Sequence, residues 1–381
     1  MKDLGLYIHI PFCVKKCNYC DFYSLGCVAD EGIERYIDCL CLHIGMEGKN
    51  YSNRRVDSVF FGGGTPSILS VEQIKKILNA IRHSFHLTED CEITIEANPG
   101  TLTEEKAESY KSLGINRVSI GLQSASDSEL RMLGRIHTFE DFQESYRLLS
   151  LAGIDNISVD IMYALPNQKT DDFIKTVDKV CEFSPEHISA YCLKIEENTY
   201  FYKIKDTLSL PDEDEQYKMY ISLCDRLEKM GYEQYEISNF AKSGKRSKHN
   251  MKYWLSLDYL GFGPASHSCI EGGRYSYSES IEEYEKSLED GNEPKKIPEA
   301  DTPLTRDEII DEFVMLRLRL SDGVNVKEFE ERFEISFENR YKKISMYEKS
   351  GYICKKNGAY AFTPKGFFVS NYILSDILES I

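Results

Sequence analysis

Alternation between short apolar runs and longer helical patterns constrains the fold of this 381-residue chain more than any other feature. Six runs of strand length are apolar on both faces, as in a parallel sheet that is buried on both sides, at 4–10, 56–62, 92–97, 115–122, 156–165 and 187–193. Helical patterns that open with cap residues separate them, at 70–85, 103–113, 138–152, 170–183 and 212–230. About six β/α units in this order predict an α/β fold with a complete or partial (β/α) barrel.

Polar and flexible groups follow each of the six predicted strands. In a (β/α) barrel, the loops after the carboxyl ends of the strands meet at one mouth and carry the reactive groups. The groups in these positions are the cysteine loop after His9, the glycine run 62–64, Glu96, Gln123, Asp160, and Tyr191 with Lys194. The sequence therefore predicts a single functional site at this mouth.

The pattern changes after about residue 238, first to loops rich in Gly, Ser and aromatic residues and then to helices. Helices are expected at 309–320, 326–333 and 337–350, followed by a hairpin whose two-residue turn is Asn357-Gly358. We therefore expect a barrel domain at 1–237, a connecting region at 238–300 and a winged-helix-like domain at 301–381. The nearly balanced charge of that last domain favours packing or partner binding over DNA binding.

Three of the twelve cysteines, Cys13, Cys17 and Cys20, lie within eight residues directly after the first predicted strand. Three thiolates can hold three irons of a [4Fe-4S] cluster and leave the fourth iron open to an exogenous ligand. A structural zinc site is the alternative, but it needs four ligands, and only His9 and Cys27 are near enough in sequence to complete it. The other cysteines lack ligand spacing, as expected for buried free thiols.

A formal charge of −17 argues against general nucleic-acid binding, which needs clustered Lys and Arg. The sequence starts without a secretory signal, and its apolar runs are too short to span a bilayer. We expect a cytoplasmic protein with reduced thiols and no transmembrane segment.

Several motifs together resemble one known family: YIHIPFCVKKCNYCDFYS, GGGTPS, EANPG, SIGLQS and VDIMYALPNQ. They are similar to the radical S-adenosylmethionine (SAM) family of oxygen-independent coproporphyrinogen III oxidases and the related haem chaperones of the HemW branch. The resemblance implies that SAM chelates the open iron and that an electron from the cluster can cleave it to a 5'-deoxyadenosyl radical. It further implies SAM contacts at Tyr7, Tyr19, Gly63, Gly64, Thr65, Glu96, Gln123, Arg135 and Asp160.

Two features separate the branches of that family. The oxidases of that family carry a CxxxCxxCxC motif, whereas here Asp21 and Phe22 follow Cys20. They also carry a longer N-terminal extension, whereas the first cysteine here is residue 13. The segment HNMKYW matches the HNxxYW motif of the haem chaperones, which implies haem contacts at His249, Tyr253 and Trp254. His267 is a second candidate iron ligand. We expect a flanking basic run without acids to meet the haem propionates, through Lys242, Lys245, Arg246, Lys248 and Lys252.

Three hypotheses follow. The first is a radical-SAM haem chaperone that delivers haem to a haemoprotein acceptor, expected to be respiratory and membrane-associated, with peripheral membrane contact during delivery and a reducing electron donor. The second is an enzyme of the coproporphyrinogen III oxidase (dehydrogenase) type, or one acting on another tetrapyrrole. The third is a zinc-stabilised interaction protein. Whether the chain is an enzyme stays open at this stage.

Overall fold

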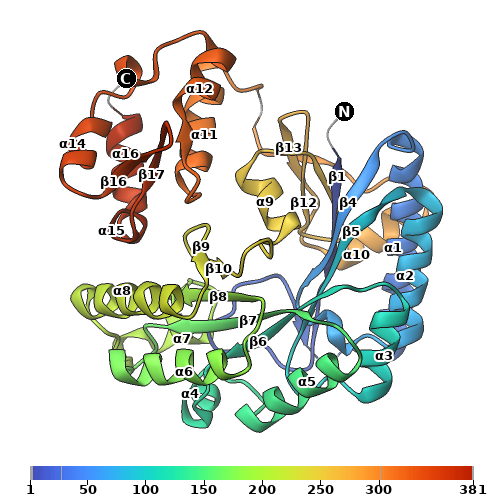
Figure 1. Cartoon of the computed structure of the whole chain (residues 1–381). Helices are drawn as coiled ribbons and strands as arrows, with labels where there is room; N and C mark the ends of the chain where they lie inside the picture. Colours follow the sequence, from blue (N-terminus) through green and yellow to red (C-terminus); the bar gives the residue numbers. More distant parts are fainter. Residues whose placement is uncertain (1–2, 27, 301, 380–381) are drawn as a thin grey trace.

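The computed structural model describes residues 3–26, 28–300 and 302–379. In these ranges the central element is a twelve-stranded sheet in the order β14-β13-β12-β11-β1-β4-β5-β6-β7-β8-β10-β9. The neighbouring strands from β11 to β8 pair in parallel. The sheet curves, and helices line its outer side (Figure 1). The result is an open barrel, which confirms the predicted fold class.

All six predicted strands are present. Their bounds are β1 Leu4–Ile10, β4 Arg55–Gly63, β5 His86–Ala97, β6 Arg117–Gln123, β7 Asn156–Tyr163 and β8 His187–Cys192. The five predicted helices are also present, as α2 Val71–Ser84, α3 Glu104–Ser112, α5 Phe139–Leu151, α6 Thr170–Glu182 and α8 Glu213–Lys229. The Ser70 and Gln73 side chains form a capping box at the N-terminus of α2, so the helix begins where these cap residues predict.

The longest helix, α1 (Asp30–Asn50), was not predicted. Its N-cap, Ala29, has no side-chain cap hydrogen bond, and glycines interrupt its sequence. One of them, Gly48, packs closely on α2, where an added methyl would lie 2.5 Å from Ser84 Cβ. Tertiary packing against α2 therefore stabilises a helix that local helix propensity does not predict.

Residues 238–300 hold more regular structure than the expected loops. Four short strands extend the sheet beyond β1: β11 Tyr259–Phe262, β12 His267–Ile270, β13 Gly273–Ser276 and β14 Ile297–Pro298. At its other edge the sheet is extended by β10 Asn239–Ala241 and by β9 Glu233–Gln234, which lies just before this region. Helices α9 (Lys248–Trp254) and α10 (Ile281–Glu289) belong to the same region. These strands have two to four residues, too few for a period-two pattern to be detectable.

The C-terminal region is a separate group of helices with a three-stranded sheet, drawn in orange and red in Figure 1. Its elements are α11 Arg306–Leu318, β15 Val324–Asn325, α12 Val326–Phe333, α13 Phe337–Arg340, α14 Ile344–Lys349, β16 Ile353–Lys356, β17 Ala359–Phe362, α15 Pro364–Phe368 and α16 Ser370–Leu378. The predicted hairpin is confirmed, with positive φ at both turn residues, Asn357 (52°) and Gly358 (79°). The helix expected at 337–350 is instead two short helices that separate at Tyr341, whose hydroxyl donates to Asp311.

Six short elements complete the described structure: β2 Phe12–Cys13, β3 Leu25–Gly26, the 3-10 turns η1 Pro66–Ile68 and η2 Lys205–Thr207, α4 Asp127–Met132 and α7 Tyr200–Lys203. None of the helices in the described ranges combines the length and the apolar character needed to cross a membrane. The two expected boundaries between the three domains remain predictions.

Candidate functional site at the mouth of the barrel

The cysteine loop begins at Cys13, the last residue of β2, directly beyond the carboxyl end of β1. The glycine run after β4 anchors its first part. Gly64 N donates to Ile10 O at 2.8 Å, Thr65 N donates to Phe12 O at 2.8 Å, and Thr65 Oγ1 contacts Cys13 Sγ at 3.5 Å. An added methyl on Gly64 would lie 2.6 Å from Phe12 O. Glycine at this position is therefore required by the chain's own packing, and not only by the expected approach of a ligand.

A hydrogen-bonded chain across the mouth links Cys17, in the middle of the loop, to Thr65 beside Cys13. Arg135 Nη1 donates to Cys17 Sγ at 3.4 Å, and Arg135 Nη2 donates to Asn98 Oδ1 at 2.5 Å and to Gly121 O at 2.6 Å. Asn98 Nδ2 in turn donates to Thr65 Oγ1 at 3.0 Å. The expected Arg135 is thus partly buried among site groups, and Asn98 is a site residue that was not singled out from the EANPG motif.

Donor chemistry at the loop fits a three-thiolate cluster. Cys13, Cys17 and Cys20 are all partly exposed free thiols. Within the described residues, no three His, Cys, Asp or Glu side chains converge on a single metal ion. A cubane does not require such convergence, because each thiolate ligates a different iron. His9 has both ring nitrogens engaged, with Tyr7 Oη and Tyr23 O each at 3.2 Å, and Cys27 lies outside the described residues.

Two carboxylates face the interior of the barrel below the loop. Glu96 Oε2 accepts from Gly63 N at 3.2 Å, and both Asp160 carboxylate oxygens lie 3.1 Å from Ser119 Oγ. Burial, followed by repulsion from Asp160, raises the pKa of Glu96 to about 8. Burial also raises the pKa of Asp160. These oxygens can accept hydrogen bonds from the ribose and ammonium groups of a ligand such as SAM.

The remaining expected SAM residues lie around these groups. Tyr7 stacks on Phe60. Burial raises the pKa of the Tyr19 hydroxyl, which lies near Arg135, Cys17 and Asp160. Gln123 ends β6 in the left-handed backbone region, with φ of 71°, and its amide lies beside Gly121. Gly63 has a φ of 110°. The fold thus brings all nine expected residues to one end of the barrel.

One interior charge was missed from the sequence. Arg117 begins β6, is 2% exposed, and has no hydrogen-bond partner for Nε and Nη1 within the described structure. Its positive charge favours the ionised forms of Glu96 and Asp160. The signal was present, because an arginine inside the otherwise apolar run 115–122 cannot face a dry core without a functional or electrostatic reason.

Helix α9 places the expected haem histidine inside the molecule. His249 is 0% exposed, with Nδ1 3.1 Å from Ser58 Oγ and Nε2 2.9 Å from Tyr253 Oη. Its ring stacks on Phe60 at 5.4 Å, and burial lowers its pKa to about 3. Trp254, at the end of α9, has the guanidinium of Arg319 5.9 Å from its ring. His249 is therefore neutral, as an iron ligand must be, but both of its nitrogens are engaged.

The basic run around α9 is not a free cationic patch in this structure, and its expected contact with the haem propionates stays a prediction. Each of its cations is paired with an acid from a distant part of the chain: Lys242 and Lys245 with Glu186, Arg246 with Asp322, Lys248 with Asp90, and Lys252 with Asp57. Counting acids along the sequence could not reveal partners that only folding brings close.

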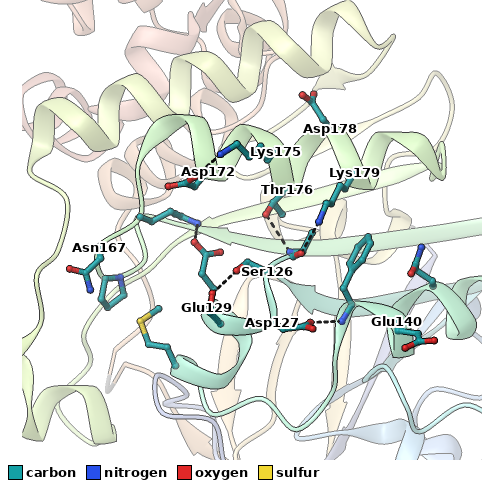
Figure 2. Close-up of a pocket in the computed structure, with 17 residues that line it drawn as sticks. Ser126, Asp127, Glu129, Glu140, Asn167, Asp172, Lys175, Thr176, Asp178 and Lys179 are labelled. Atoms are coloured by element: carbon teal, nitrogen blue, oxygen red, sulfur yellow. Dashed lines mark hydrogen bonds and ion pairs between the residues drawn. The ribbon is translucent and has the colours of Figure 1, made fainter.

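A second concavity lies beside the mouth, between the starts of α4, α5 and α6, with a volume of about 1160 Å³ (Figure 2). Most of its charged groups already have structural partners. Asp127 accepts from Phe139 N at 2.9 Å, Asp172 pairs with Lys175 at 2.9 Å, and Lys179 donates to Ala125 O at 3.2 Å. These contacts therefore hold the starts of three helices in place, and the residues that line the cleft show no recognisable ligand-binding arrangement.

Comparison with known proteins agrees with this geometry. The Radical SAM superfamily model matches residues 7–180, and the HemN C-terminal domain model matches residues 304–369. "Heme chaperone HemW" of Haemophilus influenzae is 35% identical over 98% of this chain and 97% of its own length. The chain belongs to the HemW family of radical SAM proteins. The Bacillus subtilis "Heme chaperone HemW" is 34% identical over 98% of this chain and 99% of its own.

Among solved structures, the Escherichia coli radical SAM enzyme coproporphyrinogen III oxidase (HemN) superposes with a TM-score of 0.86. It covers 99% of this chain and 90% of its own at 22% identity, which establishes the shared fold. Membership of the radical SAM family implies a [4Fe-4S] cluster and SAM as cofactors. The expected family and cofactors are thereby confirmed.

Proposed function

We propose that this protein is a haem chaperone: it binds haem, carries a SAM-ligated [4Fe-4S] cluster, and passes the haem to a haemoprotein acceptor. The observation that carries the proposal is the full-length similarity to proteins named heme chaperone HemW, at 34–35% identity over 98–100% of this chain for the first five relatives. The HNxxYW segment and the absence of a fourth cysteine after Cys20 support the same branch.

For the cofactors, we propose that Cys13, Cys17 and Cys20 ligate the cluster and that the nine residues around the mouth bind SAM. Arg135 supports both roles, because it donates to Cys17 and is held by Asn98 and Gly121. The two interior carboxylates accept hydrogen bonds from the cationic and ribose parts of SAM. When bound, a reduced cluster supplies the electron that can cleave the sulfonium.

For the haem, we propose that Tyr253 and Trp254 offer aromatic faces and that His249 ligates iron only after the Tyr253 hydroxyl leaves its Nε2. The 2.9 Å contact between these two atoms supports this order of events, since an engaged nitrogen cannot bind iron. His249→Ala should then weaken haem binding or alter the Soret spectrum while iron content stays unchanged. Smaller losses are expected for Tyr253→Ala and Trp254→Ala.

We further propose a respiratory, membrane-associated acceptor, a separate reducing electron donor, and a cytoplasmic location with peripheral membrane contact during delivery. The chemistry of the scaffold supports two of these partners: the cluster must be reduced from outside, and a carrier needs a recipient.

Haem transfer tests the proposed function directly. Protein with an anaerobically reconstituted cluster is titrated with haem, and then mixed with apomyoglobin as a generic recipient. We expect one haem per chain and quantitative transfer to the recipient. Cluster-loaded protein that binds no haem, or that never releases it, would contradict a chaperone role.

A further inference from the structure

An exposed histidine–carboxylate pair lies on the extension of the sheet beyond β1. His267 begins β12, and its Nδ1 lies 2.8 Å from Glu299 Oε1, one residue after β14. The two side chains are 57% and 40% exposed. Within the described structure, Nε2 of His267 makes no hydrogen bond to the protein. One ring nitrogen is thus oriented by an acid while the other faces solvent.

Strand register places this pair on the same face of the sheet as the haem segment. His267 pairs with Ser276, which pairs with Ile297, and cross-strand partners share a face. Two residues further along β12, on the same face, Cys269 pairs with Tyr259. The Tyr259 ring lies 4.7 Å from that of Tyr253 on α9, edge to face.

This face continues the inner surface of the barrel. Tyr259 and Gly261 of β11 pair in register with Gly5 and Tyr7 of β1. The side chain of Tyr7 packs among the interior residues. Ile297, 42% exposed, adds apolar surface beside the histidine. A flat apolar ligand lying on this face would therefore contact the pair at one end and the aromatic residues near α9 at the other.

The chemistry of the pair suits iron. A metal-ligating histidine characteristically donates its other ring N–H to a carboxylate or carbonyl, which fixes the tautomer and strengthens the ligand. Imidazole is also a common axial ligand of haem. His249 lacks a free nitrogen and any exposed surface in the same structure. An incoming haem can reach His267 without any movement of α9.

We propose that His267, oriented by Glu299, is the iron ligand that receives haem from solution, before His249 is uncovered. This inference rests on the proposed haem-carrier function and assigns its first step to a residue outside the HNxxYW segment. Glu299 acts as a positioning residue, because it holds the ring and does not itself contact the iron.

Stopped-flow mixing with haem, followed through the Soret band, tests the assignment on full-length protein with its cluster reconstituted. His267→Ala should slow association and lower haem affinity more than tenfold. Glu299→Gln, which keeps the shape but weakens the charge, should lower affinity by about tenfold, as loss of a carboxylate behind a metal-bound histidine typically does. His83→Ala removes another exposed histidine, at the end of α2, and serves as the matched control.

A second arm uses His267→Gly with free imidazole. Added imidazole should restore the wild-type Soret spectrum and haem affinity in His267→Gly while leaving the affinity of the His83→Ala control unchanged, which a purely structural role of His267 would not produce. Zn²⁺ alone and iron-free protoporphyrin are titrated in parallel. The variants should leave the binding of iron-free protoporphyrin nearly unchanged, since it offers no iron to ligate.

The outcomes separate the inference from the function on which it rests. If the wild-type protein binds no haem, the proposed carrier function itself is refuted. Wild-type association and spectra in both His267→Ala and Glu299→Gln would overturn the assignment while leaving the carrier intact. Loss of only Zn²⁺ binding in these variants would also overturn it, by making the pair a site for a bare divalent cation.

Discussion

Gly64→Ala should destabilise the barrel mouth, because the new methyl meets backbone rather than a movable side chain. It would lie 2.6 Å from Phe12 O and 2.9 Å from Ile10 O, where ordinary contacts start at 3.4 Å. Overpacking of this kind costs about 1–3 kcal/mol. Two short hydrogen bonds, from Gly64 N and Thr65 N, would also lengthen, each contributing about 1 kcal/mol. We expect the free energy of unfolding of the metal-free protein to fall by about 2–4 kcal/mol.

Urea denaturation of the metal-free protein measures this loss, and iron per chain after reconstitution measures its effect on the cysteine loop. Gly45→Ala is the matched control: Gly45 lies inside α1, and its added methyl would have nothing within 4 Å. The same chemical change there should stabilise the protein by about 0.5–1 kcal/mol, because alanine favours helix. A Gly64→Ala protein with wild-type stability and full iron content would refute the reasoning.

Three further predictions concern the cofactor site. Replacing any one of the three cluster cysteines by Ala should abolish the broad absorbance near about 400 nm and the bound iron, whereas Cys354→Ala should keep both; equal loss in Cys27→Ala would show that the ligand set is misassigned. Asp160→Asn and Glu96→Gln should reduce the change that SAM causes in the EPR spectrum of the reduced cluster while iron content stays intact, and undiminished SAM effects would remove these residues from the pocket. Because the pKa of Glu96 is raised to about 8, the folded metal-free protein favours the neutral carboxyl, and this stability is lost as pH rises from about 4.5 through about 8. Metal-free Glu96→Gln should therefore unfold at higher urea concentration than wild type at pH 9 and at the same concentration at pH 4; equal midpoints at both pH values would show that Glu96 is not held neutral.

The barrel could be predicted because its signals are local. Runs such as 4–10 and 187–193 are apolar on both faces, and Ser70, Thr103 and Thr138 each cap a helix whose start follows directly. The location of the site could be predicted equally well, because the carboxyl ends of the parallel strands in a barrel meet at one mouth. Helix α1 was not predicted, because its stability comes from packing against α2 and no local pattern encodes that packing.

The haem region could not be predicted in detail, because its character depends on partners distant in sequence. The basic run reads as an unpaired patch only until Glu186, Asp322, Asp90 and Asp57 are brought to it. The burial of His249 depends on Ser58 and Phe60, nearly two hundred residues earlier in the chain. The His267–Glu299 pair likewise forms only through strand register.

The central claim is that the protein carries haem and does not oxidise a porphyrinogen. The most direct test incubates the cluster-loaded protein with SAM, a reductant and coproporphyrinogen III, and separately with haem, under anaerobic conditions. We predict a stable Soret band with haem, and no harderoporphyrinogen or protoporphyrinogen from coproporphyrinogen III. Formation of either decarboxylated product over multiple SAM turnovers would contradict the account and assign the chain to the oxidase branch.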